Sequence, residues 1–239
     1  MKNIVFVVNK GEMLRPNSRA SITAAAVRWQ AEFMEVTEWR NPLHPACWKT
    51  EAFTIAAERL AERMASPAVS EGEPFAPAVE RTRLFILDAD VVVSAKCPNP
   101  FTTFQEGRLV VVSDRQSYCP ARDKAEVDEV EIVTGMRTLY PDYFNSGVIL
   151  ATQDWHEQFF LRAADLCERN RHLCWHDQTP FNVAAQVGQP LAYADREWNY
   201  LNPAGSVRNW TEMGTTGIHI YHFAGNPDRK SHIDMVRWE

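Results

Sequence analysis

The chain has 239 residues, of which 45% are hydrophobic, and its formal net charge is -6. A chain of this length forms one large domain or two small ones, and its hydrophobic content is that of a globular protein with a packed core. No stretch reaches the roughly 18 to 20 apolar residues that a membrane span needs. The acidic balance argues against a surface built mainly to bind a polyanion. We expect a single domain over residues 1–239.

Two features favour a cytoplasmic protein. The N-terminal stretch 1–13 has too short an apolar run for a signal peptide and no small-residue cleavage site, so it is interpreted as a first strand. The cysteines are odd in number and show no C-x-x-C spacing, which favours reduced structural thiols over a disulfide framework or a zinc site. They are Cys47, Cys97, Cys119, Cys167 and Cys174.

The first elements alternate between strand and helix. "NIVFVVN" (3–9) is a short β-branched apolar run, typical of a strand covered on both faces. Residues 17–33 carry apolar side chains at helical spacing, with Asn17 or Ser18 as the N-cap. The next two expected elements are a strand over 34–39 and a helix over 50–64. This alternation predicts an α/β fold with a mostly parallel central sheet, right-handed crossovers and flanking helices.

The second part of the chain begins with a break in this pattern. Residues 65–80 contain three prolines and a glycine, which predicts a surface insertion. The charged stretch 121–131 is interpreted as a solvated face or a mobile loop. The further expected strands cover 83–90, 108–114, 143–152 and 218–225. The further expected helices cover 154–170 and 177–188, the second closed by Gly188.

Two aspartates stand inside the apolar run "FILDADVVV" (85–93). Ionised carboxylates are almost never buried without a partner. Residues i and i+2 of an extended segment point to the same side, about 6.6 Å apart, so Asp88 and Asp90 can approach one Mg²⁺ or Mn²⁺ ion. Strand-end aspartates that accept hydrogen bonds from backbone amides would give the same motif. Sites in α/β sheets lie at the carboxyl ends of strands, where Asp88, Asp90 and Asp114 are expected.

Several motifs in order resemble the retaining glycosyltransferases of family eight, which include glycogenin and bacterial lipopolysaccharide galactosyltransferases. The motifs extend over nearly the whole chain: a strand ending near Asn9, "CWKTEAF", "LFILDADVVV", "VVVSD", "YFNSGVILAT", "HDQTPFN" and "YHFAG". The resemblance implies a GT-A nucleotide-diphospho-sugar transferase fold. It also implies transfer of a hexose from a UDP-sugar, UDP-glucose or UDP-galactose, to an acceptor hydroxyl with retention of configuration.

The resemblance gives roles to the matching residues. Asp88 and Asp90 match the metal-binding aspartates, and His222 matches the histidine that completes the ligands of Mn²⁺ or Mg²⁺. Asn9 matches the region that contacts the nucleotide base, and Asp88 lies on the nucleotide side as well. The positions that match residues around the donor sugar are Lys49, Asp114, Asn145, Asp177 and Gln178.

Each of these residues also has a structural interpretation. Asn9 and Asn145 suit turns, Asp177 suits a helix N-cap, Lys49 suits a solvated surface, and His222 suits a hydrogen-bonded core position.

The C-terminal motif departs from the family pattern. The family has a diphosphate-binding lysine followed by Pro-Trp, whereas "AGNPDRK" places Arg229 and Lys230 one or two positions later. No carboxylate stands out as a covalent nucleophile. The resemblance therefore implies front-face attack on the donor, with Gln178 or Asp177 near the anomeric carbon.

Two other functions fit parts of the sequence. A phosphatase of the haloacid-dehalogenase type also uses D-x-D after a strand, but near its N-terminus and with a later acidic pair that is missing here. A non-catalytic protein that binds a nucleotide-sugar or glycan could use the same fold. The acceptor is open between a glycan, a protein, a small polyol and a modified nucleic-acid base. The last is indicated only by basic C-terminal positions, Arg196, Arg208, Arg229, Lys230 and Arg237.

Overall fold

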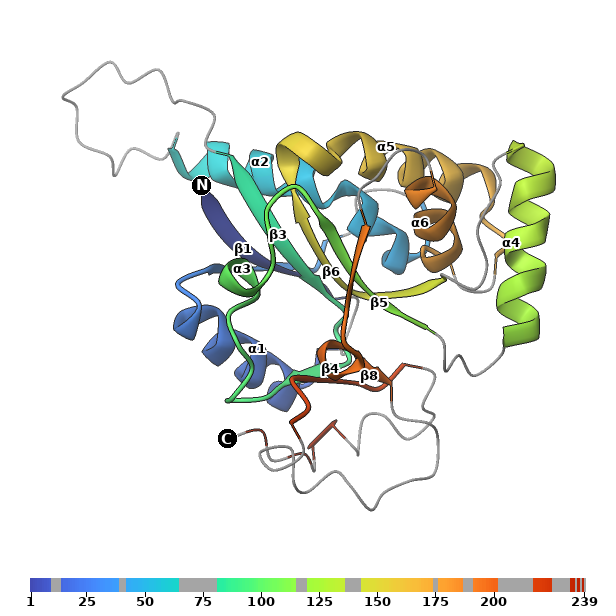
Figure 1. The fold of residues 1–239 in the computed structure, drawn as a ribbon. Coiled ribbons are helices and arrows are strands. Elements are labelled where there is room, and N and C mark those ends of the chain that lie inside the picture. The colour runs from blue at the N-terminus through green and yellow to red at the C-terminus, as the bar shows by residue number, and fades with distance from the viewer. Residues whose placement is uncertain are drawn as a thin grey trace.

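The computed structural model describes residues 1–9, 14–38, 42–64, 81–114, 120–135, 143–173, 176–186, 191–201, 217–224, 233–234, 236 and 238. Its central layer is a six-stranded sheet in the order β2-β1-β3-β6-β5-β7 (Figure 1). The strands are β1 (Lys2–Val8), β2 (Glu32–Val36), β3 (Thr82–Leu87), β5 (Leu109–Ser113), β6 (Phe144–Thr152) and β7 (Leu191–Ala194).

The sheet is mostly parallel, as predicted, with one reversed strand. β1 runs parallel to β2 and β3, and β5 runs parallel to β7, whereas β6 is antiparallel to both β3 and β5. The start of β6 therefore lies at the same edge of the sheet as the ends of β3 and β5. This reversal brings polar residues from three strands to one place.

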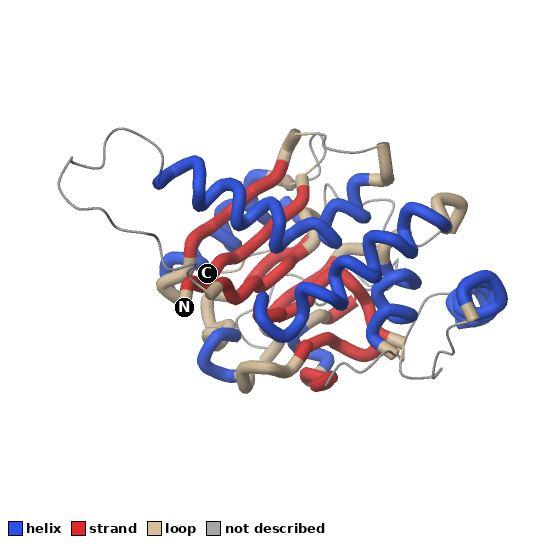
Figure 2. Tube along the Cα trace, turned by 90° about the horizontal axis from the view of Figure 1, so that it is seen from above, coloured by secondary structure: helices blue, strands red, loops and turns tan. Residues whose placement is uncertain are grey.

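Helices cover both faces of the sheet (Figure 2). They are α1 (Pro16–Arg28), α2 (Ala52–Met64), α3 (Pro100–Thr103), α4 (Pro120–Thr134), α5 (Gln153–Arg169) and α6 (Gln178–Ala185), with 3-10 turns η1 (Pro45–Glu51) and η2 (Arg196–Trp198). Strand side chains point alternately to the two faces. In β3, Ile86 therefore joins a core with Phe53 and Phe159, while Phe85 joins a second core with Trp29.

A second, three-stranded sheet completes the described part of the fold. Its strands are β4 (Val91–Val93), β9 (Ile220–His222) and β8 (Tyr200–Leu201), in the order β4-β9-β8. β4 and β9 are antiparallel, with Val91 opposite His222. The backbone N–H of Phe223 donates to the carbonyl of Asp90, with a distance of 3.0 Å. This pairing brings His222 beside Asp88 and Asp90.

Some local predictions were wrong. Helix α1 is capped at Arg15 with Pro16 in its first turn, so Asn17 and Ser18 lie inside it. The Oδ1 atom of Asn17 accepts a hydrogen bond from Trp238. The segment 121–131 is part of helix α4 and not a loop; it buries Val127 and Val130, while Lys124 and Glu129 are exposed, so the alternative of a solvated face was correct.

Other predictions concern residues outside the described part of the chain, the cysteines and membrane spans. The insertion 65–80, Gly188, Cys119 and Cys174 lie outside the described residues. Cys47, Cys97 and Cys167 are buried free thiols, as expected. No helix in the described part of the chain is long and apolar enough to cross a membrane.

Candidate functional site

Asp88, Asp90 and His222 converge where β3 ends and the short β4 begins. The Nε2 atom of His222 lies 3.4 Å from Oδ2 of Asp88 and 3.3 Å from Oδ1 of Asp90. One side-chain ligand atom from each of the three residues lies within 4.8 Å of the others. The backbone holds this arrangement, because the N–H of Asp88 donates to the carbonyl of Gly147 on β6, at 2.9 Å.

The three side chains fit a divalent cation. Nε2 of His222 is buried and faces the carboxylates of Asp88 and Asp90, while Nδ1 lies 2.9 Å from Oδ1 of Asn199. A histidine held through one ring nitrogen and open at the other is the usual arrangement of a metal ligand. Burial by itself would lower the pKa of His222, but attraction to Asp90 and hydrogen bonding to both aspartates raise it to about 9. These carboxylates therefore favour a positive charge at the place where Nε2 points.

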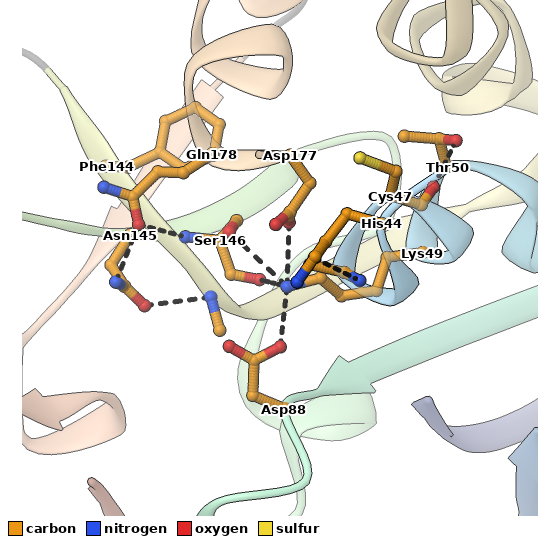
Figure 3. Close-up of polar contacts among 12 residues, drawn as sticks. His44, Cys47, Lys49, Thr50, Asp88, Phe144, Asn145, Ser146, Asp177 and Gln178 are labelled. Atoms are coloured by element: carbon orange, nitrogen blue, oxygen red, sulfur yellow. Dashed lines mark hydrogen bonds and ion pairs between the residues drawn. The ribbon is translucent and has the colours of Figure 1, made fainter. Parts of the chain in front are cut away.

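Lys49 forms the second part of the site, and its side chain points between Asp88 and Asp177 (Figure 3). Its ammonium group lies 2.6 Å from Oδ1 of Asp88 and 2.8 Å from Oδ2 of Asp177, and it donates to the carbonyl of Ser146 at 3.1 Å. Lys49 is only 1% exposed, so the interpretation as a solvated surface lysine was wrong. Buried charges of this kind are tolerated only where partners compensate them.

The ionisation of this group follows from its contacts. Burial would lower the pKa of Lys49, but Asp177 and Asp88 raise it above the ordinary lysine value. Burial would raise the pKa of Asp88, but Lys49 and His222 lower it below the ordinary range. For Asp177, burial dominates over Lys49 and raises the pKa. Lys49 and Asp88 are therefore a charged pair, and Asp177 is the carboxyl that is protonated more readily.

A third part of the site consists of amides and one carboxylate. The Nδ2 group of Asn145 donates to Oε1 of Gln178 at 2.8 Å, and the Nε2 group of Gln178 donates to Oδ2 of Asp114 at 3.2 Å. Asn145 is on β6, Gln178 opens α6 and Asp114 follows β5, and all three are buried. Amide and carboxylate groups together offer donors and acceptors of the kind that hydroxyl recognition needs.

The structure places the sequence-predicted residues as follows. Eight of them lie in the contacts described above: Lys49, Asp88, Asp90, Asp114, Asn145, Asp177, Gln178 and His222. Asn9 follows β1 and makes none of these contacts: it accepts from the N–H of Leu14 at 2.9 Å and donates to Glu35 at 2.7 Å. Asp177 stands at the N-cap of α6 without a side-chain capping bond. Arg229 and Lys230 lie outside the described residues.

Three residues of the site were missed by the sequence analysis. Ser146 and Gly147 follow Asn145 within "FNSGV", so their position in a matching motif was an available indication. Ser146 contacts Lys49, and Gly147 lies against His222. Asn199 follows η2 and holds the ring of His222, but no pattern in the surrounding sequence indicates this role.

The fold is similar to that of solved glycosyltransferases. No protein-family model matches the sequence, and no curated protein matches it. A glycosyltransferase involved in the glycosylation of the major capsid of PBCV-1 is similar over 99% of this chain and 100% of its own, with a TM-score of 0.59 and 14% identity.

The bifunctional glycosyltransferase WbbM, in its apo structure, is similar over 100% of this chain, with a TM-score of 0.55 and 13% identity. The match covers 50% of the WbbM chain, so this chain spans half of that protein. At these identities the likeness shows a shared glycosyltransferase fold.

Proposed function

We propose that the protein is a metal-dependent glycosyltransferase that moves a hexose from UDP-glucose or UDP-galactose to an acceptor hydroxyl with retention. The observation that carries this proposal is the group Asp88, Asp90 and His222, whose ligand atoms lie within 4.8 Å of one another. The group occurs in a fold shared with glycosyltransferases and beside buried polar residues. Carboxylate and imidazole ligands together suit Mn²⁺, and Mg²⁺ is the alternative.

The two ends of the site have different tasks in this proposal. Asp88, Asp90 and His222 hold the cation, which when bound supplies positive charge that offsets the charge developing on the leaving diphosphate. Asp88 serves both sides, because Oδ2 faces His222 while Oδ1 is held by Lys49. Arg229 or Lys230 binds the diphosphate, and Asn9 lies near the nucleotide base.

The donor sugar is held by the amide part of the site. Asp114, Asn145 and Gln178 present donors and acceptors to its hydroxyl groups, and Lys49 lies beside them with Asp177.

Front-face attack fits the groups near the proposed sugar position. Gln178 is a neutral amide, and Asp177 is bound to the ammonium group of Lys49 at 2.8 Å. An activated carboxylate nucleophile needs to be ionised and free to attack. Neither side chain meets this condition, so we assign them to stabilising and orienting the sugar near its anomeric carbon. The acceptor hydroxyl then attacks from the side of the departing diphosphate.

A thermal-shift titration with UDP, GDP and ADP, each with and without Mn²⁺, tests the proposal. A nucleotide at 100 times its Kd stabilises a protein by about 2.7 kcal/mol, which raises the Tm of a domain of this size by roughly 5 to 10 °C. We expect this shift with UDP only when Mn²⁺ is present. No shift with any nucleotide plus Mn²⁺ would contradict the proposal.

A second step separates catalysis from binding. The protein is incubated with Mn²⁺ and either UDP-glucose or UDP-galactose, and released UDP is measured. We expect release with one of the two donors. A UDP shift without release of UDP from either donor, in the presence of candidate acceptors, would indicate a nucleotide-sugar-binding protein.

A further inference from the structure

An unbroken series of buried side-chain hydrogen bonds joins His222 to Asp114. His222 contacts Asn199 at 2.9 Å, Asn199 donates to Asn145 at 2.9 Å, Asn145 donates to Gln178 at 2.8 Å, and Gln178 donates to Asp114 at 3.2 Å. The three amide side chains in the middle, Asn199, Asn145 and Gln178, are called the amide relay below. It connects the candidate metal ligand with the proposed sugar-binding end of the site.

The backbone fixes the direction of the relay. The N–H of Gly147 lies 2.9 Å from the Oδ1 atom of Asn145. A backbone N–H can only donate, so the atom of Asn145 that faces it must be the oxygen. The amide nitrogen of Asn145 then faces Gln178 and donates to its oxygen. The nitrogen of Gln178 in turn faces Asp114, whose carboxylate is an acceptor when ionised.

The orientation of Asn145 also determines which ring nitrogen of His222 carries the hydrogen. Because Oδ1 of Asn145 is an acceptor, the atom of Asn199 that faces it is Nδ2, at 2.9 Å. The oxygen of Asn199 therefore faces Nδ1 of His222, and that nitrogen must carry the hydrogen. Nε2 is left toward Asp88 and Asp90, whose carboxylate oxygens lie 3.4 Å and 3.3 Å away. When a cation replaces the proton on Nε2, this is the nitrogen that offers its lone pair to it.

We infer that Asn199 is a positioning residue for the cation site. It accepts the Nδ1–H of His222 and so holds the ring with Nε2 directed at Asp88 and Asp90, and the amide relay holds Asn199 in that orientation. The inference rests on the metal site of the proposed function. Loss of an outer hydrogen-bond partner of a ligating histidine lowers metal affinity roughly 10- to 100-fold.

The first test measures the Kd for Mn²⁺ by isothermal titration calorimetry, without nucleotide. We expect Asn199→Ala to bind about 10 to 100 times more weakly than the wild type. Asn199→Asp is expected to retain most of the affinity, because its carboxylate still accepts the Nδ1–H. Asn170→Ala is the matched control, since Asn170 is 2% exposed and donates to Leu166 at the end of α5, away from His222.

The second test observes the histidine ring and needs no variant. In the ¹⁵N–¹H NMR spectrum of the protein loaded with diamagnetic Mg²⁺, we expect the ring hydrogen of His222 on Nδ1. A ring hydrogen on Nε2, or wild-type Mn²⁺ affinity in Asn199→Ala, would overturn the inference while leaving the metal site in place. A wild-type protein that binds neither ion would contradict the metal site itself.

Discussion

Gly147 lies so close to His222 that no side chain fits between them. A methyl group on Gly147 would lie 2.1 Å from Cε1 and 2.6 Å from Nδ1 of the ring, and 2.8 Å from Oδ1 of Asn145. Real carbon contacts are about 3.5 to 4.0 Å. Glycine at this position of β6 is therefore a condition for seating the histidine of β9 against the two aspartates.

Replacing Gly147 by alanine is expected to abolish tight Mn²⁺ binding, because the added methyl group displaces the ring of His222. Calorimetry with Mn²⁺ and the UDP thermal shift measure the effect. Gly135→Ala is the control: φ is +68° and nothing lies within 4 Å of the added carbon. It is expected to cost about 1 to 2 kcal/mol of stability and to leave Mn²⁺ binding unchanged. Wild-type Mn²⁺ affinity in Gly147→Ala would mean that His222 is not a ligand in this geometry.

The loss of a single proposed metal ligand is expected to prevent metal-dependent binding of UDP. Asp90→Ala and His222→Ala are each expected to abolish the Mn²⁺-dependent part of the UDP shift and metal-dependent turnover. Both variants should still unfold cooperatively in the absence of ligand. Asp154→Ala removes an exposed carboxylate that pairs only with the surface residue Arg81 among the described contacts, and it serves as the control. Full Mn²⁺-dependent activity in either ligand variant would exclude this metal site.

Lys49→Met tests the buried charge group. The substitution leaves Asp88 and Asp177 without the ammonium group that lies 2.6 Å and 2.8 Å from them. Breaking a buried ion pair by removing one partner costs about 3 to 5 kcal/mol, so we expect a loss of that size in urea unfolding. The double variant Lys49→Met with Asp177→Asn is expected to recover part of the stability, because one of the two carboxylates that lost the ammonium group is replaced by a neutral amide. An unchanged unfolding free energy in the single variant would show that the carboxylates do not depend on Lys49.

The sequence predicted the parts of the site that depend on local pattern. Asp88 follows the buried strand β3 and Asp114 follows β5, and the rule that sites lie at strand ends placed both correctly. The direction of β6 was not predictable in this way. All nine residues of β6 are buried, so buried and exposed side chains do not alternate along the strand. Nothing in its sequence indicates which strands it pairs with or in which direction it runs.

The burial of Lys49 and the role of Asn199 depend on contacts between distant segments. Lys49 meets a carboxylate 39 positions away and a carbonyl 97 positions away. Asn199 meets His222, 23 positions away on β9, and Asn145, 54 positions away on β6. These contacts form only in the packed fold. The sequence around Lys49 and Asn199 therefore does not indicate them.

His156, a buried histidine outside the site, makes the stability of the protein depend on pH. His156 is completely buried near the start of α5, where its Nδ1 accepts from the N–H of Thr152 at 2.8 Å. Burial lowers its pKa to about 4 from the ordinary value of 6.5. The folded state therefore holds His156 neutral, while the unfolded chain takes up a proton below about pH 6.5. The stabilisation is complete above that pH and is lost as the pH falls towards 4, by up to about 3 kcal/mol.

Urea unfolding at several pH values between 7 and 4.5 measures this effect. His156→Gln has no proton to take up at this position, so its unfolding free energy is expected to fall less steeply with decreasing pH than that of the wild type. The difference between the two curves isolates His156, because the other titrating groups are common to both proteins. His172→Gln is the control, since His172 is exposed and paired with Glu129. Parallel curves for the wild type and His156→Gln would show that His156 does not stay neutral in the folded protein.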